Sequence, residues 1–199
     1  PAVDHKLRKR LGELALKGTK SIDYVSTGTV EFLYDQQNER FYFMEMNTRI
    51  QVEHPVTEMV TGIDLIKEQI RIAAGEKLKI QQDNIQLKGW CIECRINAED
   101  YQNNFLPCPG KIETLVLPGG PGVRLDTHIY PGYKISPFYD SLVAKLITHG
   151  HNRAEAIKIM QRALNEFSIA PIKTTIPFHL QLLENPLFLK GDISTHFVQ

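Results

Sequence analysis

Polar side chains alternate with apolar ones along residues 45–53, and their types could bind a metal ion, hold an anion and remove a proton. They are Glu45, Asn47, Arg49, Gln51 and Glu53. In an extended segment alternate side chains point to the same face, so the sequence predicts a polar row roughly 26 Å long. The alternative is the solvated face of a surface strand, although such faces rarely combine carboxylates, amides and a guanidinium without any lysine.

A predicted β-hairpin leads into this row. Residues 29–34 and 41–46 are rich in aromatic and β-branched side chains, and residues 35–40 between them are polar. This pattern is typical of two strands joined by a loop. If the loop is centred near Asn38, the symmetry of the hairpin places Glu31 opposite Glu45.

Two glutamates that face each other across a hairpin need a compensating partner. Directly opposed residues have Cβ atoms about 4.5–5.5 Å apart, so the carboxylates repel unless a cation lies between them or one takes up a proton. Asn47 lies on the same face as Glu45 and adds an amide oxygen. Two carboxylates and an amide oxygen suit Mg²⁺ or Mn²⁺. The hairpin therefore predicts a divalent metal site; the alternative is a pair of solvated glutamates at a sheet edge.

Composition and charge exclude several other classes of protein. The chain has 199 residues, 42% of them hydrophobic, and its 23 basic residues balance 23 acidic ones. No bulk charge therefore indicates binding to nucleic acid or to a membrane surface. No apolar run reaches the length of about 18 residues that a membrane span needs. Because the sequence begins with Pro1, we expect it to be a piece of a longer protein.

Hydrophobic periodicity predicts an α+β protein with two domains. Helices are expected over residues 4–18 (with Asp4 as N-cap), 65–74 (ended by Gly75), 153–167 and 177–183. Further strands are expected over residues 90–97, 111–117, 123–129 and 141–149. The polar stretch 79–84 is the candidate boundary, so we expect one domain over residues 1–84 and a second over 85–199.

Other residues that could do chemistry favour structural roles. Cys91 and Cys94 have the spacing of a metal or redox pair, but an extended strand would point them to opposite faces. The odd total of three cysteines suits a reducing compartment. The glycine-rich segment 118–122 lacks a following helix signal and is interpreted as a turn. The histidines are scattered, and His54, beside Glu53, is interpreted as structural.

Three segments carry a resemblance to a known family. Residues 45–58 (EMNTRIQVEHPVTE) resemble the signature of biotin carboxylases, and residues 93–100 (ECRINAED) are similar to a second one. Tyr139-Asp140-Ser141 with Lys145 fits a third. The resemblance covers essentially the whole chain. It implies the end of an ATP-grasp domain followed by the biotin carboxylase C-terminal domain.

The resemblance also implies a metal and nucleotide site. Glu31, Glu45 and Asn47 match the family's metal ligands, which hold two Mg²⁺ or Mn²⁺ ions that bridge the phosphates of ATP. The two glutamates thereby count as ATP-binding residues.

A bicarbonate and biotin site follows from the same resemblance. Arg49, Gln51 and the backbone of Val52 match the bicarbonate-binding positions, and Glu53 matches the general base. Arg95 matches the group that stabilises the enolate of biotin. Arg49, Glu53 and Arg95 are thus the candidate catalytic residues.

The function that the resemblance implies is the carboxylation of biotin on a carrier protein, with ATP and bicarbonate, through carboxyphosphate. We expect this to be the first step of acetyl-CoA carboxylation to malonyl-CoA in cytoplasmic fatty acid synthesis. The expected partners are biotin carboxyl carrier protein, carboxyltransferase subunits and a second copy in a homodimer. The alternatives are a pyruvate or propionyl-CoA carboxylase, another ATP-grasp ligase such as a carbamoyl-phosphate synthetase, and a non-catalytic module that docks the carrier.

Some of the family's features fall outside this sequence. The glycine-rich lid over ATP, the nucleotide-binding lysines and a bicarbonate-contacting lysine would all lie before Pro1, so we expect the chain alone to be inactive. Pro121 stands where relatives often carry a bulky residue near a subunit interface, which leaves dimerisation through this part of the protein open.

Overall fold

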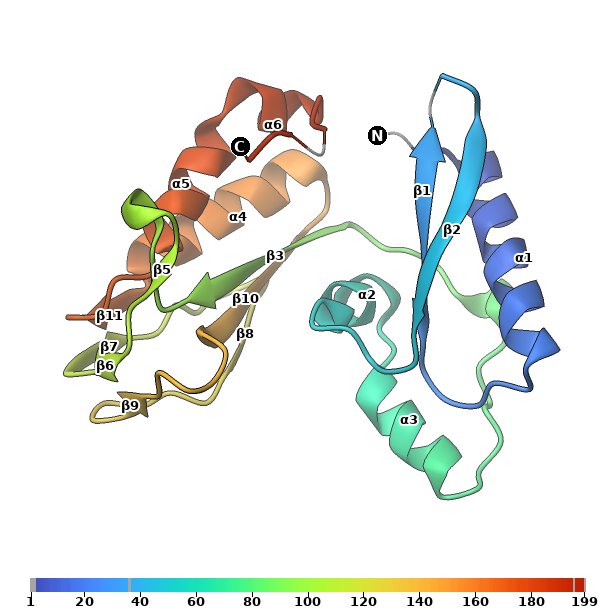
Figure 1. Ribbon diagram of the computed structural model, residues 1–199, viewed down its shortest axis with the longest axis horizontal. Helices are drawn as coiled ribbons and strands as arrows, with labels where there is room; N and C mark the ends of the chain where they lie inside the picture. The colour runs from blue at the N-terminus through green and yellow to red at the C-terminus, as the bar shows by residue number, and fades with distance from the viewer. Residues whose placement is uncertain (1–2, 36, 195, 199) are drawn as a thin grey trace. The chain divides into compact units, whose positions relative to one another are not determined.

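The computed structural model describes residues 3–35, 37–194 and 196–198, and it confirms a mixed α+β architecture (Figure 1). The chain divides into two compact units. The first runs to Glu58 and also includes Gly62–Ile85, and the second comprises Met59–Thr61 and the residues from Gln86 onward.

The first unit begins with helix α1, His5–Ser21. Asp4 is its N-cap, as predicted, and its Oδ1 accepts a hydrogen bond from the backbone nitrogen of Leu7 at 2.7 Å. The helix continues three residues past Gly18, because a single glycine lowers helix stability by only about 1 kcal/mol and does not terminate a helix by itself.

Strands β1 (Thr29–Asp35) and β2 (Arg40–Asn47) form the predicted hairpin. Glu31 pairs directly with Glu45, as the hairpin symmetry predicted. The register then shifts between Glu31 and Phe32, which pairs with Phe43, so Met44 is an extra residue in β2. A bulge of this kind bends the bulged strand and increases its twist. The symmetry about Asn38 therefore holds only for the half of the hairpin that carries the glutamates.

The expectation of one straight polar row over residues 45–53 is wrong. Strand β2 ends at Asn47, the chain bends at Thr48 and Arg49, and Glu53 is the N-cap residue of helix α2 (His54–Thr61). The sequence analysis expected no helix between residues 18 and 65, so it missed helix α2, whose first turn contains Pro55. Proline is accommodated in the first turn of a helix, where its missing N–H has no intrahelical partner to lose.

Helix α3 (Leu65–Ala73) follows the prediction closely. Asp64 caps it by accepting from the backbone nitrogen of Lys67 at 2.8 Å, and Gly75, with a φ of 87°, lies just beyond its end. Glycine adopts this left-handed conformation without the steric cost that a side chain would add.

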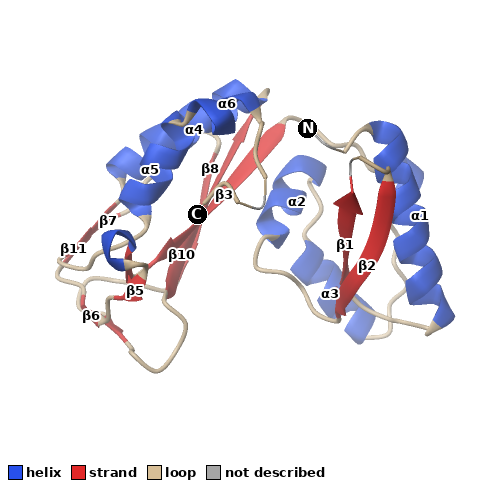
Figure 2. Cartoon of the chain, turned by 45° about the horizontal axis from the view of Figure 1, so that its top comes forward, coloured by secondary structure: helices blue, strands red, loops and turns tan. Residues whose placement is uncertain are grey.

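The second unit is built around a three-stranded antiparallel sheet in the order β3-β10-β8. The strands are β3 (Trp90–Asn97), β10 (Leu142–Gly150) and β8 (Val123–Thr127), and helix α4 (Arg153–Glu166) packs against them (Figures 1 and 2). Their facing side chains form the hydrophobic core, which includes Ile96, Leu146, Met160 and Leu164.

Short elements complete the second unit, and the single strand expected over residues 111–117 is two separate ones. The strand pairs are β4 (Glu99–Asp100) with β5 (Leu106–Pro107), β6 (Gly110–Lys111) with β9 (Lys134–Ile135), and β7 (Thr114–Val116) with β11 (Ser168–Ala170). Helices α5 (Ile176–Glu184) and α6 (Pro186–Lys190) lie near the C-terminus, and Tyr101–Asn103 forms a 3-10 turn. Another 3-10 turn, Gln82–Asn84, belongs to the first unit.

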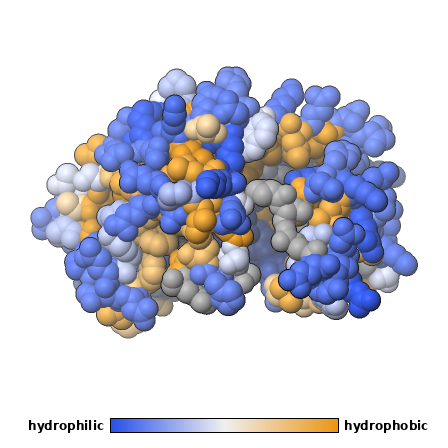
Figure 3. All heavy atoms as spheres, turned by 90° about the horizontal axis from the view of Figure 1, so that it is seen from above, coloured by the Kyte–Doolittle hydropathy of each residue, from blue (hydrophilic) through white to orange (hydrophobic). Residues whose placement is uncertain are grey.

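Burial differs between the two units. The hydrophobic core cluster consists of side chains of the second unit alone, whereas helix α1 and strands β1 and β2 contain no fully buried residue among those described. Hydrophilic side chains cover much of the face in Figure 3, with hydrophobic ones between them. Within the described ranges, no helix is long and apolar enough to cross a membrane.

Candidate active site

The carboxylates of Glu31 and Glu45 share one hydrogen-bond donor. Asn47 Nδ2 lies 2.9 Å from Glu31 Oε1 and 2.9 Å from Glu45 Oε1. The two directly opposed glutamates bring like charges together on the same face of the hairpin. The amide nitrogen partly offsets the repulsion between them, because its two N–H groups can serve both oxygens.

The same three side chains fit a divalent metal ion. Mg²⁺ is commonly held by one or two carboxylates, with waters and substrate phosphates as its other ligands. Among the described residues, no group of three or more His, Cys, Asp or Glu residues suited to a metal occurs. Turning the amide of Asn47 by half a turn would present its oxygen, in place of its nitrogen, beside Glu31 and Glu45.

Arg49 and Gln51 extend this network beyond the end of β2. Arg49 Nη1 donates to Gln51 Oε1 at 2.7 Å and to the carbonyl of Ile50 at 3.1 Å, and its Nη2 lies 3.4 Å from Asn47 Oδ1. Gln51 Nε2 in turn donates to Glu31 Oε1 at 3.3 Å. Gln51 therefore connects an exposed guanidinium, which can bind an anion, to the carboxylate pair.

Val52 and Glu53 lie in the turn that starts helix α2. Glu53 is exposed and does not use its side chain to cap the helix. A carboxylate in this position can accept a proton from a bound molecule.

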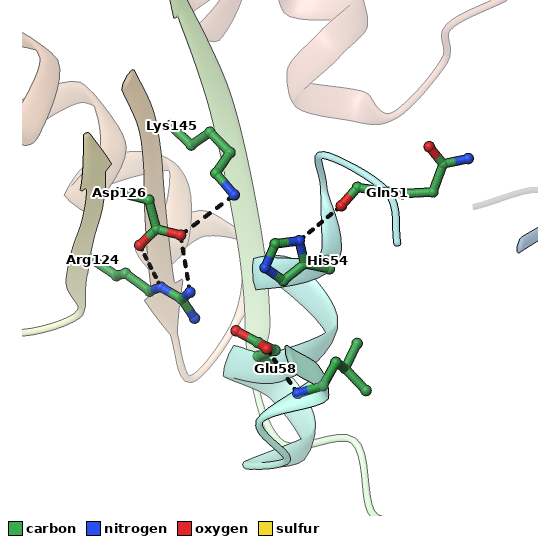
Figure 4. Close-up of polar contacts among 7 residues, drawn as sticks. Gln51, His54, Glu58, Arg124, Asp126 and Lys145 are labelled. Carbon is green, nitrogen blue, oxygen red and sulfur yellow. Dashed lines mark hydrogen bonds and ion pairs between the residues drawn. The ribbon is translucent and has the colours of Figure 1, made fainter. Parts of the chain in front are cut away.

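Hydrogen bonds hold both ends of helix α2. His54 Nδ1 lies 2.8 Å from the carbonyl of Gln51, and the buried carboxylate of Glu58 accepts from the backbone nitrogen of Leu65 at 2.8 Å (Figure 4). His54 thus contributes to the chain's own hydrogen bonding, in line with its structural interpretation.

Arg95 lies in β3 of the second unit, with an exposed side chain, and belongs to a row of charges across the sheet. It pairs directly with Lys145 of β10, which pairs with Asp126 of β8. Asp126 contacts Lys145 Nζ at 3.4 Å and Arg124 Nε at 2.8 Å (Figure 4). Burial opposes the charged form of Asp126, but the bonds and charges of Arg124 and Lys145 outweigh it and lower the pKa of this carboxyl. Asp126 is therefore a stable counter-ion for Lys145, the residue that pairs with Arg95.

The sequence interpretation missed Arg124 and Asp126. A usable signal was present, because two charged residues spaced by two in a predicted strand point to the same face.

The Cys91 and Cys94 thiols are unsuited to metal or redox chemistry. Burial, and then the charge of Glu93, raise the pKa of each thiol to about 12. Metal binding and thiol exchange require the thiolate, so both side chains remain protonated near neutral pH.

Comparison with known proteins shows to which class and then to which family of proteins the chain belongs. Residues 1–81 match the Carbamoyl-phosphate synthase L chain, ATP binding domain, which places this part among ATP-binding domains of ligases. Residues 93–199 match the Biotin carboxylase C-terminal domain, so the chain belongs to the biotin carboxylase family. The match of the second unit separates the chain from the carbamoyl-phosphate synthetases and confirms the resemblance seen in the sequence.

Individual relatives agree with this family. Biotin carboxylase 1 of Bacillus subtilis is 56% identical over all 199 residues, which cover 44% of its length. A pyruvate carboxylase subunit of Methanothermobacter thermautotrophicus is 54% identical over 198 residues, which cover 40% of its length. The chain thus spans less than half of the curated relatives that it matches.

A solved structure shows the same fold. The biotin carboxylase domain dimer of Hydrogenobacter thermophilus 2-oxoglutarate carboxylase, in complex with MgADP, ADP and bicarbonate, matches with a TM-score of 0.95 and 46% identity. The match covers 99% of this chain and 43% of that one.

Proposed function

We propose that this chain is part of a biotin carboxylase, an ATP-dependent ligase that carboxylates biotin on a carrier protein with bicarbonate as the carbon source. The observation that carries the proposal is the connected set of side chains at the end of β2. It joins a carboxylate pair to an anion-binding guanidinium and leads into the turn that carries Glu53.

The carboxylate end of this set would bind metal and nucleotide. Glu31, Glu45 and Asn47 would hold two Mg²⁺ or Mn²⁺ ions against the phosphates of ATP. When bound, such ions neutralise the charge that develops as the γ-phosphoryl group is transferred.

The other end of the set would activate bicarbonate. Arg49, Gln51 and the backbone of Val52 would hold the anion, and Glu53 would remove its proton. The deprotonated oxygen can then attack the γ-phosphate of ATP, which gives carboxyphosphate and ADP. Hydrogen bonding of Arg49 to Gln51 supports this assignment, since it limits the motion of the guanidinium.

Arg95 would act on biotin. Carboxyphosphate breaks down to CO₂ and phosphate, and the phosphate can take up the proton that the ureido nitrogen of biotin must lose to capture CO₂. A guanidinium beside the ureido oxygen would stabilise the enolate that forms. The neighbouring pair of Lys145 and Asp126 supports a charged, hydrogen-bonded sheet face around Arg95.

The wider context is proposed from the relatives. The metal and bicarbonate residues would belong to a domain over residues 1–84 and Arg95 to a domain over 85–199. The partners of the protein would be the carrier protein, carboxyltransferase subunits and a second copy of itself. The protein would act in the cytoplasm. Acetyl-CoA carboxylation is the main candidate pathway, and the Methanothermobacter relative supports pyruvate carboxylation as the second.

The decisive experiment replaces Glu53 by Gln in a protein of the relatives' full length that carries this chain. Loss of the general base should lower biotin carboxylation by about 10²-fold or more, while the affinity for ATP stays within about twofold. Carboxylation is followed by fixed ¹⁴C-bicarbonate, and nucleotide affinity by calorimetry. Glu13→Gln, an exposed change on α1, is the matched control.

An equal loss of ATP affinity in Glu53→Gln would show that Glu53 is structural. If binding of the carrier protein is the only activity found and is indifferent to Mg²⁺ and bicarbonate, the chain is a docking module instead.

A further inference from the structure

Strand β3, which carries Arg95, is an edge strand. The sheet order is β3-β10-β8, so only one side of β3 pairs with another strand. Backbone groups on the other side need partners from elsewhere, because buried polar groups left unpaired are costly. Arg95 and Asn97 are two positions apart, so their backbone groups point to the same side.

The start of helix α5 supplies these partners. Thr175 Oγ1 donates to the carbonyl of Arg95 at 3.0 Å and accepts from the backbone nitrogen of Asn97 at 3.0 Å. The backbone nitrogen of Thr175 donates to the carbonyl of Asn97 at 3.0 Å. His179 Nε2, one turn further along, lies 2.8 Å from the same Arg95 carbonyl. The carbonyl of Arg95 thus receives two side-chain hydrogen bonds.

The chemistry of these bonds determines which atoms carry the protons. A carbonyl oxygen only accepts, so His179 must carry its proton on Nε2. Burial lowers the pKa of His179, which favours the neutral imidazole. The Thr175 hydroxyl accepts from Asn97 and therefore directs its own proton toward Arg95. Thr175 is buried, with 5% of its surface exposed, so bulk water has little access to its hydroxyl.

We propose that His179 and Thr175 are positioning residues that hold Arg95 through its backbone carbonyl. The proposal rests on the proposed role of Arg95 at biotin. The guanidinium is exposed at the end of a long side chain, so its average position depends on where the backbone holds its Cα–Cβ bond. Misplacement of a reacting group by 1 Å can cost about 10²-fold in rate.

The test uses a protein of the relatives' full length that carries this chain. His179→Leu removes the donor, and His179→Gln keeps a side-chain N–H. We expect His179→Leu to lower kcat for biotin carboxylation about threefold to tenfold, with the KM for ATP unchanged. His179→Gln should retain most of the activity. Glu184→Leu, an exposed change on the same helix, is the matched control.

Two further readouts separate positioning from a general structural role. Bicarbonate-dependent ATP hydrolysis without biotin should be unchanged in His179→Leu, since Arg95 would act only on biotin. In an Arg95→Ala background, His179→Leu should cause no further loss of carboxylation, because residues that act through one another are not additive. Thr175→Val should give the same pattern and serves as a second probe if His179→Leu does not fold.

The outcomes are distinguishable. Any one of three results would overturn the positioning role alone. They are equal losses of carboxylation and ATP hydrolysis in His179→Leu and Thr175→Val, failure of His179→Gln to retain activity, and full additivity of His179→Leu with Arg95→Ala. Unchanged carboxylation in Arg95→Ala would overturn the proposed role of Arg95 and this inference with it.

Discussion

At the scale of single residues, Glu31 and Glu45 illustrate how a fold tolerates a charge arrangement that stability alone would disfavour. Directly opposed like charges in a hairpin are destabilising. Here Asn47 donates to both carboxylates and Gln51 donates to Glu31, so neutral amides compensate the pair. A neutral donor between two carboxylates preserves their charge for a cation, which a lysine in the same place would neutralise.

His179 gives a prediction about pH. Burial lowers its pKa below the ordinary value of 6.5, against a smaller opposing contribution from its bond to Arg95. The unfolded chain therefore binds more protons, and the stability contribution of neutral His179 is complete above pH 6.5. This contribution should be lost as the pH falls from 6.5 through the lower pKa of His179 in the folded protein. Below that pKa, His179 should cause no further change in stability.

Urea unfolding of the chain at several pH values between about 7.5 and 5 measures this loss. Trp90 is the only tryptophan and reports on the second unit through its fluorescence. In His179→Gln this part of the pH dependence should be absent. If the free energy of unfolding changes with pH equally in the unchanged chain and in His179→Gln, His179 does not contribute to the pH dependence.

At the scale of elements, stability is concentrated in the sheet and helix of the second unit. Leu146 on β10 is fully buried against the core, whereas Leu106 on β5 is 60% exposed. Leu146→Ala should lower the free energy of unfolding by about 2–5 kcal/mol, since it leaves a cavity in a packed core. Leu106→Ala, the matched control, should change it by less than about 0.5 kcal/mol. Chemical denaturation followed at Trp90 compares the two, and similar losses would contradict the assigned core.

Helix α2 is the element with the largest functional consequence, because it turns the polar segment after β2 away from a straight line. Glu53 is at its N-cap position, and Pro55 lies in its first turn. The bend lets Gln51 reach back to Glu31. In a straight strand these two side chains would lie too far apart for a hydrogen bond, because each residue adds about 3.3 Å.

At the scale of the whole molecule, the proposed function assigns to this chain only one part of a catalytic site. The chain spans 44% of the Bacillus relative. Under the proposed function, ATP binding would also need the family's lid and its nucleotide-binding lysines, to which the resemblance assigns none of the residues named above. We therefore expect no bicarbonate-dependent ATP hydrolysis by the chain alone, measured as phosphate release with Mg²⁺ and free biotin. A full-length biotin carboxylase in the same assay is the control, and clear turnover by the chain would contradict the expectation.

Much of the architecture could be predicted from local sequence patterns. Alternation and helical periodicity predicted the hairpin, β3 and α4, and the side chains of Asp4 and Asp64 marked helix starts. Hairpin symmetry predicted the pairing of Glu31 with Glu45, and motif resemblance predicted the family. Two features were missed for specific reasons. Helix α2 is short and has a proline, Pro55, in its first turn, and no local signal marked the bulge at Met44.

The sequence by itself thus determined the residue types of the site, the α+β class and the family, because these depend on neighbours within a few positions of the chain. The tertiary structure alone decided the bend after β2, the charge row across β3, β10 and β8, and the attachment of α5 to the edge of β3. Thr175 and Arg95 are 80 residues apart in the chain. A contact of that kind exists only once the core has packed, since no local propensity brings the two segments together.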